Sequence, residues 1–218
     1  MDLHLTDRVA IVTGSSRGLG LAAARALAAE GCLVTICARH ADALQASAAI
    51  VAADAGDASR VLQVVADVST PDGAAAVVEQ TMAARGRLDV LVNNVGKAGG
   101  GGIEAATDRD WQDAIDQTLF PAVRMSRLAL PHLRHSDAAV ILMIASIWGR
   151  ESGGRMTYNA VKAAEISLAK AMAHELAPQG VRVNSIAPGS IAFEGGSWWR
   201  RQQEDPQGMA EFVQREIP

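Results

Sequence analysis

Short apolar runs alternate with alanine-rich helical patterns along the first part of the chain. Residues 9–12 are an apolar run without polar alternation, which is typical of a strand covered on both faces in a parallel sheet. Residues 33–38 and 60–66 are also predicted to be strands. The stretches 19–30 and 41–53 between them are rich in alanine, which suits helices that pack closely on a sheet. The pattern therefore predicts β-α-β-α-β, one half of a doubly wound α/β sheet.

The same alternation continues to residue 186 without a linker or a tandem repeat. The expected elements are the strands 88–93, 138–145 and 181–186 and the helices 71–85, 108–135 and 157–177. We therefore predict a three-layer, doubly wound parallel sheet of the Rossmann type with six strands. Residues 1–218 are expected to form a single domain, in which 190–218 is a loop that contacts substrate.

Composition and charge narrow the functional classes. The 218 residues are 49% hydrophobic and carry 20 basic and 24 acidic side chains, a net charge of −4. Without a basic stretch, neither nucleic acid nor an anionic membrane is an expected partner. No apolar run reaches the ~20 residues of a membrane span, and no signal-peptide pattern is recognised, so a cytoplasmic enzyme is expected. Cys32 and Cys37 are expected to be reduced packing residues, and no metal site is predicted.

The first apolar run leads into a glycine-spaced turn. Gly14, Gly18 and Gly20 lie within TGSSRGLG. Glycine permits unusual backbone angles and lets a ligand approach the backbone closely. The helix that follows directs free N–H groups and its positive dipole end at the turn, which suits a pyrophosphate. The motif predicts a dinucleotide-binding domain; the alternative is a turn that only tightens the strand–helix connection.

A serine, a tyrosine and a lysine are spaced so that they can meet. Tyr158 and Lys162 are four residues apart, so one helical face presents both. Tyr158 is the only tyrosine, and it follows Ser146, at the end of a predicted strand, by twelve residues. The strand end and the helix start can therefore place the three side chains around one point.

Together these motifs resemble the short-chain dehydrogenase/reductase family over essentially the whole chain. The matching segments are TGSSRGLG at 13–20, Asp67 within ADV, NNVG at 93–96, Ser146, YNAVK at 158–162 and RVNSIAPGSI at 182–191. The resemblance implies hydride transfer between a nicotinamide and a carbonyl or alcohol. It assigns Tyr158 as acid and base, Ser146 to the substrate oxygen and Lys162 to the ribose. Many similar members act on 3-oxoacyl thioesters, which makes these a candidate substrate class.

The physical chemistry of the three side chains agrees with these roles. A phenol has a pKa near ~10, but a cation ~4 Å away in an effective dielectric of ~20 favours the phenolate by up to ~4 kcal/mol. Lys162, helped by oxidised nicotinamide, is therefore expected to bring the pKa of Tyr158 close to neutrality, where proton exchange is efficient. Ser146 is expected to donate a hydrogen bond as charge develops on the substrate oxygen.

The resemblance also implies a cofactor site, with Asp67 at the adenine, Asn93 along the adenosine ribose and the turn 188–191 at the nicotinamide. NADP(H) is favoured over NAD because the second strand ends in CARH, with Arg39 and no acidic residue. Arg17 lies in the glycine turn, so two guanidiniums can clamp a 2′-phosphate; the less favoured alternative is that both are ordinary surface arginines. The expected cofactor-binding residues are Gly14, Ser16, Arg17, Gly18, Leu19, Gly20, Arg39, Asp67, Val68, Asn93, Gly96, Tyr158, Lys162, Pro188, Gly189 and Ile191.

Four features depart from the family pattern. Thr118 stands where an asparagine usually supports proton relay, and Pro121 is expected to kink the helix beside it because proline lacks an N–H. The spacing from Ser146 to Tyr158 is one residue shorter than usual, and Phe193 replaces a frequent threonine. The resemblance also implies a further helix and a seventh strand after the last residue, so a truncated or incomplete chain is expected.

The resemblance further implies a homo-oligomer that forms through the helices 108–135 and 157–177. A dimer is expected for this chain, and a tetramer for a completed one. The alternative function is an NADP-binding protein with weakened catalysis that acts through partner contacts, suggested by Thr118 and the missing tail. The intact Ser146, Tyr158 and Lys162 favour the enzyme.

Overall fold

The computed structural model describes residues 2–97 and 99–216. The chain divides into two compact units, one that ends at Ala187 and one that begins at Pro188. The first unit contains the sheet and is taken first. The second unit is described by itself.

Six parallel strands form one sheet in the order β3-β2-β1-β4-β5-β6. They are β1 (Val9–Thr13), β2 (Leu33–Ala38), β3 (Val61–Val65), β4 (Val90–Asn93), β5 (Val140–Ile144) and β6 (Arg182–Ile186). The strand order reverses between β1 and β4, where Ala10 pairs with Val90 and Ile11 with Leu91. This confirms the predicted doubly wound sheet, in which ligands bind at the carboxyl ends of the strands beside such a reversal.

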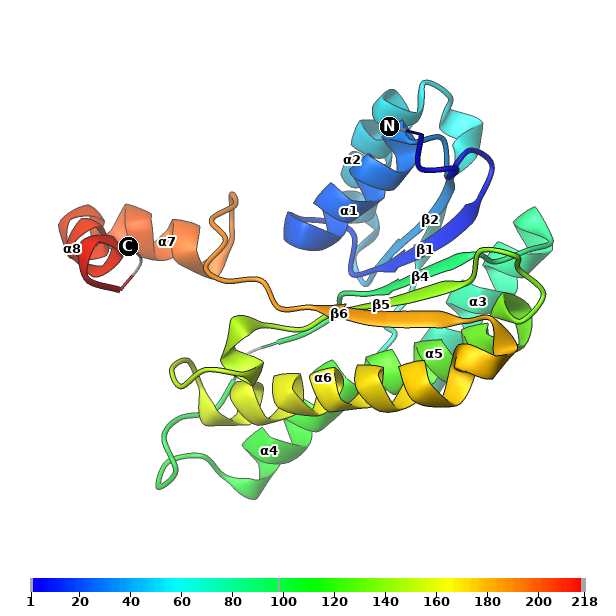
Figure 1. Cartoon of the computed structure of the whole chain (residues 1–218). Helices are drawn as coiled ribbons and strands as arrows, with labels where there is room; N and C mark the ends of the chain where they lie inside the picture. The colour runs from blue at the N-terminus through cyan, green and yellow to red at the C-terminus, as the bar shows by residue number, and fades with distance from the viewer. Residues whose placement is uncertain (1, 98, 217–218) are drawn as a thin grey trace. The chain divides into compact units, whose positions relative to one another are not determined.

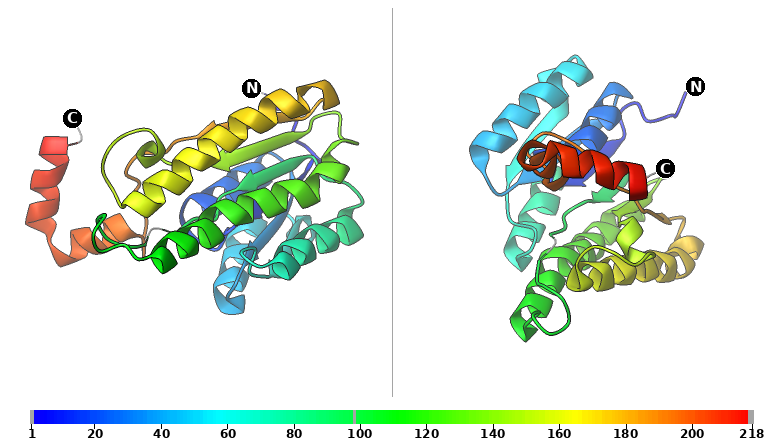
Figure 2. Two further views of the ribbon diagram at one scale, coloured as in Figure 1. Left: turned by 90° about the horizontal axis from the view of Figure 1, so that it is seen from below. Right: turned by 90° about the vertical axis from the view of Figure 1, so that its left-hand side faces the viewer.

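Helices cover both faces of the sheet (Figure 1, Figure 2). One face carries α1 (Gly18–Ala29) and α2 (Ala41–Ala55), whose alanines pack with Ala10, Val12 and Ile36. The other carries α3 (Pro71–Arg85), α5 (Phe120–Leu133) and α6 (Met156–Leu176), packed on the opposite side chains of the strands. Because both faces are covered, Val9, Ala10, Ile11 and Val12 have no exposed surface at all.

The expected helix 108–135 is interrupted. It consists of α4 (Asp108–Ala114), a π-helical turn (Ile115–Leu119) and α5. The N–H of Phe120 donates to the carbonyl of Ile115, five residues earlier, just before Pro121, which has no N–H to donate. The disturbance predicted beside Thr118 is therefore present as a π-helical turn, a feature that is frequent at functional sites.

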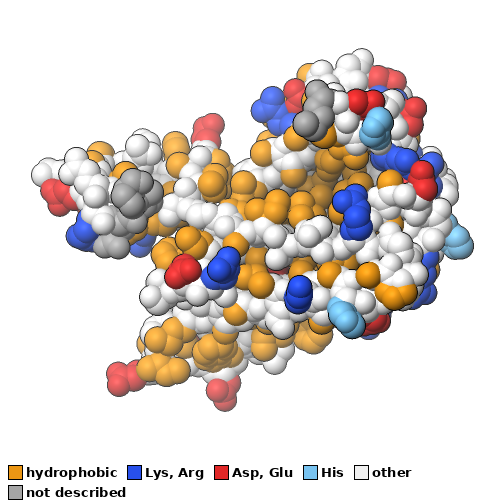
Figure 3. All heavy atoms as spheres, viewed as in Figure 1, with side chains coloured by type: hydrophobic (Ala, Val, Ile, Leu, Met, Phe, Trp, Pro, Cys, Tyr) orange, Lys and Arg blue, Asp and Glu red, His pale blue; other side chains and the backbone are white. Residues whose placement is uncertain are grey.

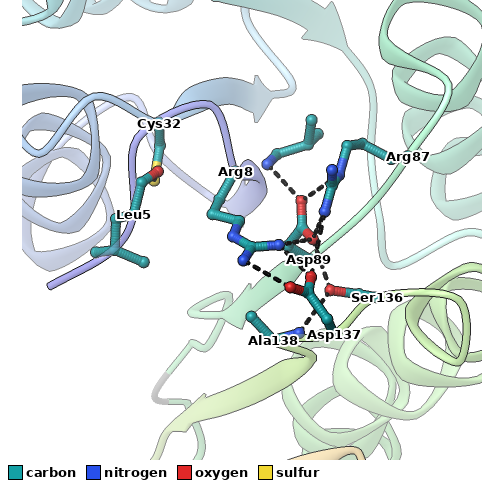
Figure 4. A network of polar contacts seen from close by, with 9 residues as sticks. Leu5, Arg8, Cys32, Arg87, Asp89, Ser136, Asp137 and Ala138 are labelled. Carbon is teal, nitrogen blue, oxygen red and sulfur yellow. Dashed lines mark hydrogen bonds and ion pairs between the residues drawn. The ribbon is translucent and has the colours of Figure 1, made fainter.

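A buried carboxylate joins the amino ends of three strands (Figure 4). Asp89 precedes β4 and accepts hydrogen bonds from Arg87, from the Ser136 hydroxyl at 2.6 Å and from the N–H of Val9 at 2.8 Å. Desolvation raises the pKa of Asp89, but the hydrogen bonds from Arg87, Ser136 and Val9 outweigh it and hold the pKa below its ordinary value. Arg8 adds a contact to Asp89 and binds Asp137.

The two cysteines serve packing, as predicted. Cys32 and Cys37 are free and buried, and desolvation raises the pKa of each thiol to about 11. A thiol that keeps its proton at neutral pH is a poor nucleophile and a poor metal ligand.

The second unit is helical where a loop is predicted. It contains α7 (Ser197–Glu204) and α8 (Pro206–Glu216). The rings of Trp198 and Phe212 lie 5.3 Å apart and hold the two helices together. A largely apolar cavity of about 420 Å³ lies within this unit, lined in part by Trp198, Met209 and Val213. None of the described helices is long and apolar enough to cross a membrane.

Candidate active site

The predicted serine, tyrosine and lysine meet at the carboxyl end of β5. Ser146 follows β5 and begins a 3₁₀ turn (Ile147–Gly149), where its hydroxyl accepts from the N–H of Trp148 at 3.2 Å. Tyr158 lies in the first turn of α6, and its phenol is close enough to the Ser146 side chain for Ser146 to affect its pKa. A strand end and a helix start thus converge as the spacing predicts.

The pKa of Tyr158 is raised rather than lowered. Desolvation is the largest cause, the interaction with Ser146 acts in the opposite direction, and the charge of Glu165 raises the pKa further. Lys162 alone does not bring this pKa toward neutrality, and the expectation that it does so together with oxidised nicotinamide stays a prediction. The phenol keeps its proton at neutral pH.

Lys162 explains this difference, because its ammonium is engaged elsewhere. The side chain is only 2% exposed, and Nζ donates to the carbonyl of Ile144 at 2.8 Å and to Oε2 of Glu165 at 2.7 Å. Nζ lies 5.7 Å from the centroid of the Tyr158 ring. Desolvation lowers the pKa of Lys162, and the interaction with Glu165 offsets only part of that effect.

Glu165 is the residue of this site that sequence reasoning missed. Its side chain is 3% exposed, and desolvation raises its pKa to about 7 although Lys162 opposes the shift. The signal was its position three residues after Lys162, which places both on one helical face. Most such pairs lie on the protein surface, so the spacing alone does not predict burial.

Two glycines allow α6 to come close to the strand ends. A Cβ atom on Gly149 would lie 2.7 Å from the carbonyl carbon of Lys162, and one on Gly96 would lie 3.0 Å from its Nζ. Thr118, from the π-helical turn, is fully buried beside Gly96. Its hydroxyl accepts from the N–H of Lys97 at 3.1 Å, so it fixes the loop that follows β4.

The glycine turn has the geometry that an anion site requires. Gly14 and Gly18 have φ of 62° and 57°, in the left-handed region that favours glycine. Arg17 precedes the first residue of α1 in an extended conformation, and no described side chain caps this helix. Uncapped N–H groups at a helix start suit a phosphate. The turn therefore fits the pyrophosphate of a dinucleotide.

Two further residues that sequence reasoning missed brace this turn. Asn94 donates from Nδ2 to the carbonyls of Thr13 and Gly14, at 3.0 and 3.2 Å. Ser15 accepts from the N–H of Cys37 at 2.9 Å. Ser16 is tied to α2, because its carbonyl accepts from the Ser47 hydroxyl.

Asn93, expected along the ribose, is turned into the protein interior. It is 5% exposed, and its amide donates to the Ser126 hydroxyl at 3.0 Å and to the sulfur of Met143 at 3.4 Å. Its neighbour Asn94 is the one that contacts the glycine turn. Successive side chains at a strand end point to opposite faces, which separates the two asparagines.

The other expected cofactor residues are distributed over both units. Arg39, just after β2, is exposed, and its Nη1 lies 4.0 Å from Oδ2 of Asp67. Arg17 is also exposed, Leu19 is partly buried and Val68 is buried. The structure assigns Pro188, Gly189 and Ile191 to the unit that begins at Pro188. No cluster of metal-ligating side chains is present within residues 2–97 and 99–216.

Comparisons with known proteins identify the family of the chain. The family model described as short chain dehydrogenase matches residues 8–204. A 3-oxoacyl-[acyl-carrier-protein] reductase from Synechocystis is 35% identical over 191 residues, which cover 87% of this chain and 76% of that protein.

Solved structures are similar over most of the chain. L-sorbose reductase from Gluconobacter frateurii, complexed with NADPH and L-sorbose, is 34% identical with a TM-score of 0.90, and the match covers 98% of this chain and 82% of that one. NAD⁺-bound xylitol dehydrogenase is 26% identical with a TM-score of 0.83, and the match covers 91% of this chain and 75% of that one. These neighbours hold either nicotinamide cofactor, so similarity alone does not choose between NADP and NAD.

Proposed function

We propose, because the chain belongs to the short chain dehydrogenase family, that it is an NADP(H)-dependent oxidoreductase that interconverts a ketone and an alcohol. The observation that carries this proposal is the convergence of Ser146, Tyr158 and Lys162 at the carboxyl end of β5. When bound, the nicotinamide supplies or accepts the hydride.

The protein side chains handle the proton and the substrate oxygen. In the reductive direction Tyr158 donates its proton to the carbonyl oxygen, and its raised pKa keeps that proton available at neutral pH. Ser146, which interacts with Tyr158, is placed to donate to the same oxygen as charge develops there. In the oxidative direction Tyr158 must first lose its own proton, and its phenolate then accepts the proton of the alcohol.

The choice of NADP(H) is supported by charge at the end of β2. Arg39 is the first residue after that strand, and no acidic residue stands there to accept from a ribose 2′-hydroxyl. Arg17 adds a second exposed guanidinium at the start of α1. Asp67 forms a long ion pair with Arg39, in which Nη1 lies 4.0 Å from Oδ2. The guanidinium therefore still has N–H groups that can donate to a phosphate.

A ketone is the substrate class that the relatives support. The names of the Synechocystis and Gluconobacter proteins specify a 3-oxoacyl thioester and L-sorbose, and both are ketones. We propose reduction of a ketone, with 3-oxoacyl thioesters first in any screen.

The test is a ketone screen with NADPH, followed by the absorbance of the reduced cofactor, on the wild-type chain and on Tyr158→Phe. The substitution removes the transferable proton and should lower kcat/KM by about 10²–10⁴-fold. NADPH affinity, measured by fluorescence, should stay within about twofold. A Tyr158→Phe variant with full activity would overturn the mechanism. NADPH binding without turnover of any ketone would instead favour the alternative of a binding protein with weakened catalysis.

A further inference from the structure

Glu165, which forms a buried pair with Lys162, has no part in the roles described so far. We propose that Glu165 is a positioning residue of the acid–base site, which anchors and neutralises the Lys162 ammonium so that Tyr158 retains its proton for ketone reduction. The inference rests on the proposed function in that it treats Tyr158 as the acid. Its test below needs neither cofactor nor substrate.

The geometry leaves the ammonium little freedom. Nζ of Lys162 is held from one side by the carbonyl of Ile144 at the end of β5 and from another by Oε2 of Glu165, at 2.8 and 2.7 Å. Both side chains are almost completely buried. The backbone of Gly96 closes a third side, because a Cβ atom there would lie 3.0 Å from Nζ. Glu165 therefore determines where the lysine head group lies.

The charges explain why this position matters to Tyr158. An unpaired ammonium 5.7 Å from the phenol ring would favour the phenolate, since opposite charges attract strongly where water is excluded. The Glu165 carboxylate, 2.7 Å from the same ammonium, cancels most of that field. Glu165 also acts directly on Tyr158, where its negative charge opposes ionisation of the phenol.

Glu165 responds to one charged group in the described part of the chain, Lys162. Within α6 it interacts with Lys162 and Tyr158, and Lys162 is the only group that shifts its pKa apart from burial. Around the Lys162 ammonium lie the uncharged carbonyl of Ile144 and the backbone of Gly96, with Thr118 beside that glycine. On β6 the nearest cation in sequence, Arg182, is exposed.

Glu165 is ionised throughout the range in which Tyr158 loses its proton. Its pKa of about 7 lies below the ordinary range of a phenol, and the pKa of Tyr158 is raised above that range. Removal of the carboxylate leaves the phenolate as the remaining charge partner of Lys162. The tyrosine should then ionise at lower pH.

The sole tyrosine of the chain makes a direct measurement possible. Phenolate absorbance in the near ultraviolet, recorded against pH, reports Tyr158 alone. Glu165→Gln keeps a hydrogen-bond acceptor for Nζ but removes the charge, and it should lower the midpoint by about 1 pH unit. Glu165→Asp, which keeps the charge, should titrate close to the wild type. Tyr158→Phe supplies the baseline without a transition.

A second neutral variant keeps the titration informative if Glu165→Gln does not fold. Glu165→Met fills a similar volume without a polar group, and circular dichroism at each pH checks that every variant is folded. A midpoint lowered in either folded neutral variant, and restored in Glu165→Asp, supports the proposal. Midpoints at or above the wild-type value in the folded neutral variants overturn it. Failure of the ketone screen would reject the proposed function and leave this titration unaffected.

Discussion

A single glycine sets how closely α6 approaches Ser146. Gly149 has no side chain where a Cβ atom would meet the backbone of Lys162 and Ala163 at 2.7–2.9 Å. Gly149→Ala should therefore destabilise the protein by about 1–3 kcal/mol, since backbone atoms must move to relieve the overlap. Urea denaturation measures the change. Gly102→Ala is the matched control, because nothing lies within 4 Å of its Cβ position, and an equal loss in both variants would contradict the explanation.

Substitution of Arg39 tests whether the protein prefers NADPH to NADH. Arg39→Ala removes one of the two exposed guanidiniums expected at the 2′-phosphate, and NADPH affinity should fall about tenfold. NADH, which lacks that phosphate, should bind nearly as before. Fluorescence titration of both cofactors gives the ratio, and Arg182→Ala controls for the loss of an exposed arginine elsewhere. Equal losses for NADPH and NADH would contradict the assignment.

For single residues, the sequence predicts which side chains form the candidate active site better than it predicts their burial and contacts. The spacing of Ser146, Tyr158 and Lys162 was sufficient to bring them together, because helix and strand geometry are regular. The pKa shifts of Tyr158 and Lys162 were not predictable, because they depend first on burial and then on Glu165, and burial is a tertiary property. The exchange of roles between Asn93 and Asn94 has a similar cause, since a one-residue shift at a strand end turns a side chain to the opposite face.

At the scale of elements, Asp89 holds the starts of β1, β4 and β5 together, and this makes stability depend on pH. Its folded pKa is lower than in the unfolded chain, so its contribution is complete above the unfolded value of about 3.8 and is lost as pH falls through the folded pKa. Asp89→Asn should cost about 1–3 kcal/mol at neutral pH, because Arg87, Ser136 and Val9 lose a charged acceptor.

The measurement is urea denaturation of the wild type and Asp89→Asn between about pH 3 and 7. The difference between the two proteins should shrink toward the acid end. Asp54→Asn is the control, because Asp54 is paired with Arg25 on the surface and its loss should matter less. A difference independent of pH would contradict the role of the Asp89 charge.

The π-helical turn could be predicted from the local sequence, but the helices α7 and α8 could not. The π-helical turn follows from Pro121, since a missing donor disturbs the helix in any context. The helices of 190–218 were harder to predict, because the glycines at 195 and 196 and Pro206 read as loop signals. Pro206 is instead the first residue of α8, a position where its missing N–H has no cost.

At the scale of the whole molecule, the exposed side of α6 predicts a dimer. Ala160, Ala163, Ser167 and Ala171 are exposed small residues on this helix, and hydrophobic side chains gather over α4 and α6 in Figure 3. Small side chains permit a second helix to approach closely. Ser167→Arg should therefore convert a dimer to a monomer in light scattering, while Ala83→Arg on α3 should not. A wild-type monomer, or a dimer unaffected by Ser167→Arg, would contradict this interface.

The strand order also has a consequence for the time course of biosynthesis. In the finished sheet β1 lies between β2 and β4, but its contact with Asp89 joins residues 80 positions apart. Until β4 leaves the ribosome, the future centre of the sheet is an open edge, which is a site where strands of other chains can pair. At 5–20 residues per second, the roughly 25 residues between β3 and β4 take about 1 to 5 seconds to synthesise. For that interval the nascent chain presents one edge of β1, whose residues are all buried in the finished sheet, without a neighbouring strand.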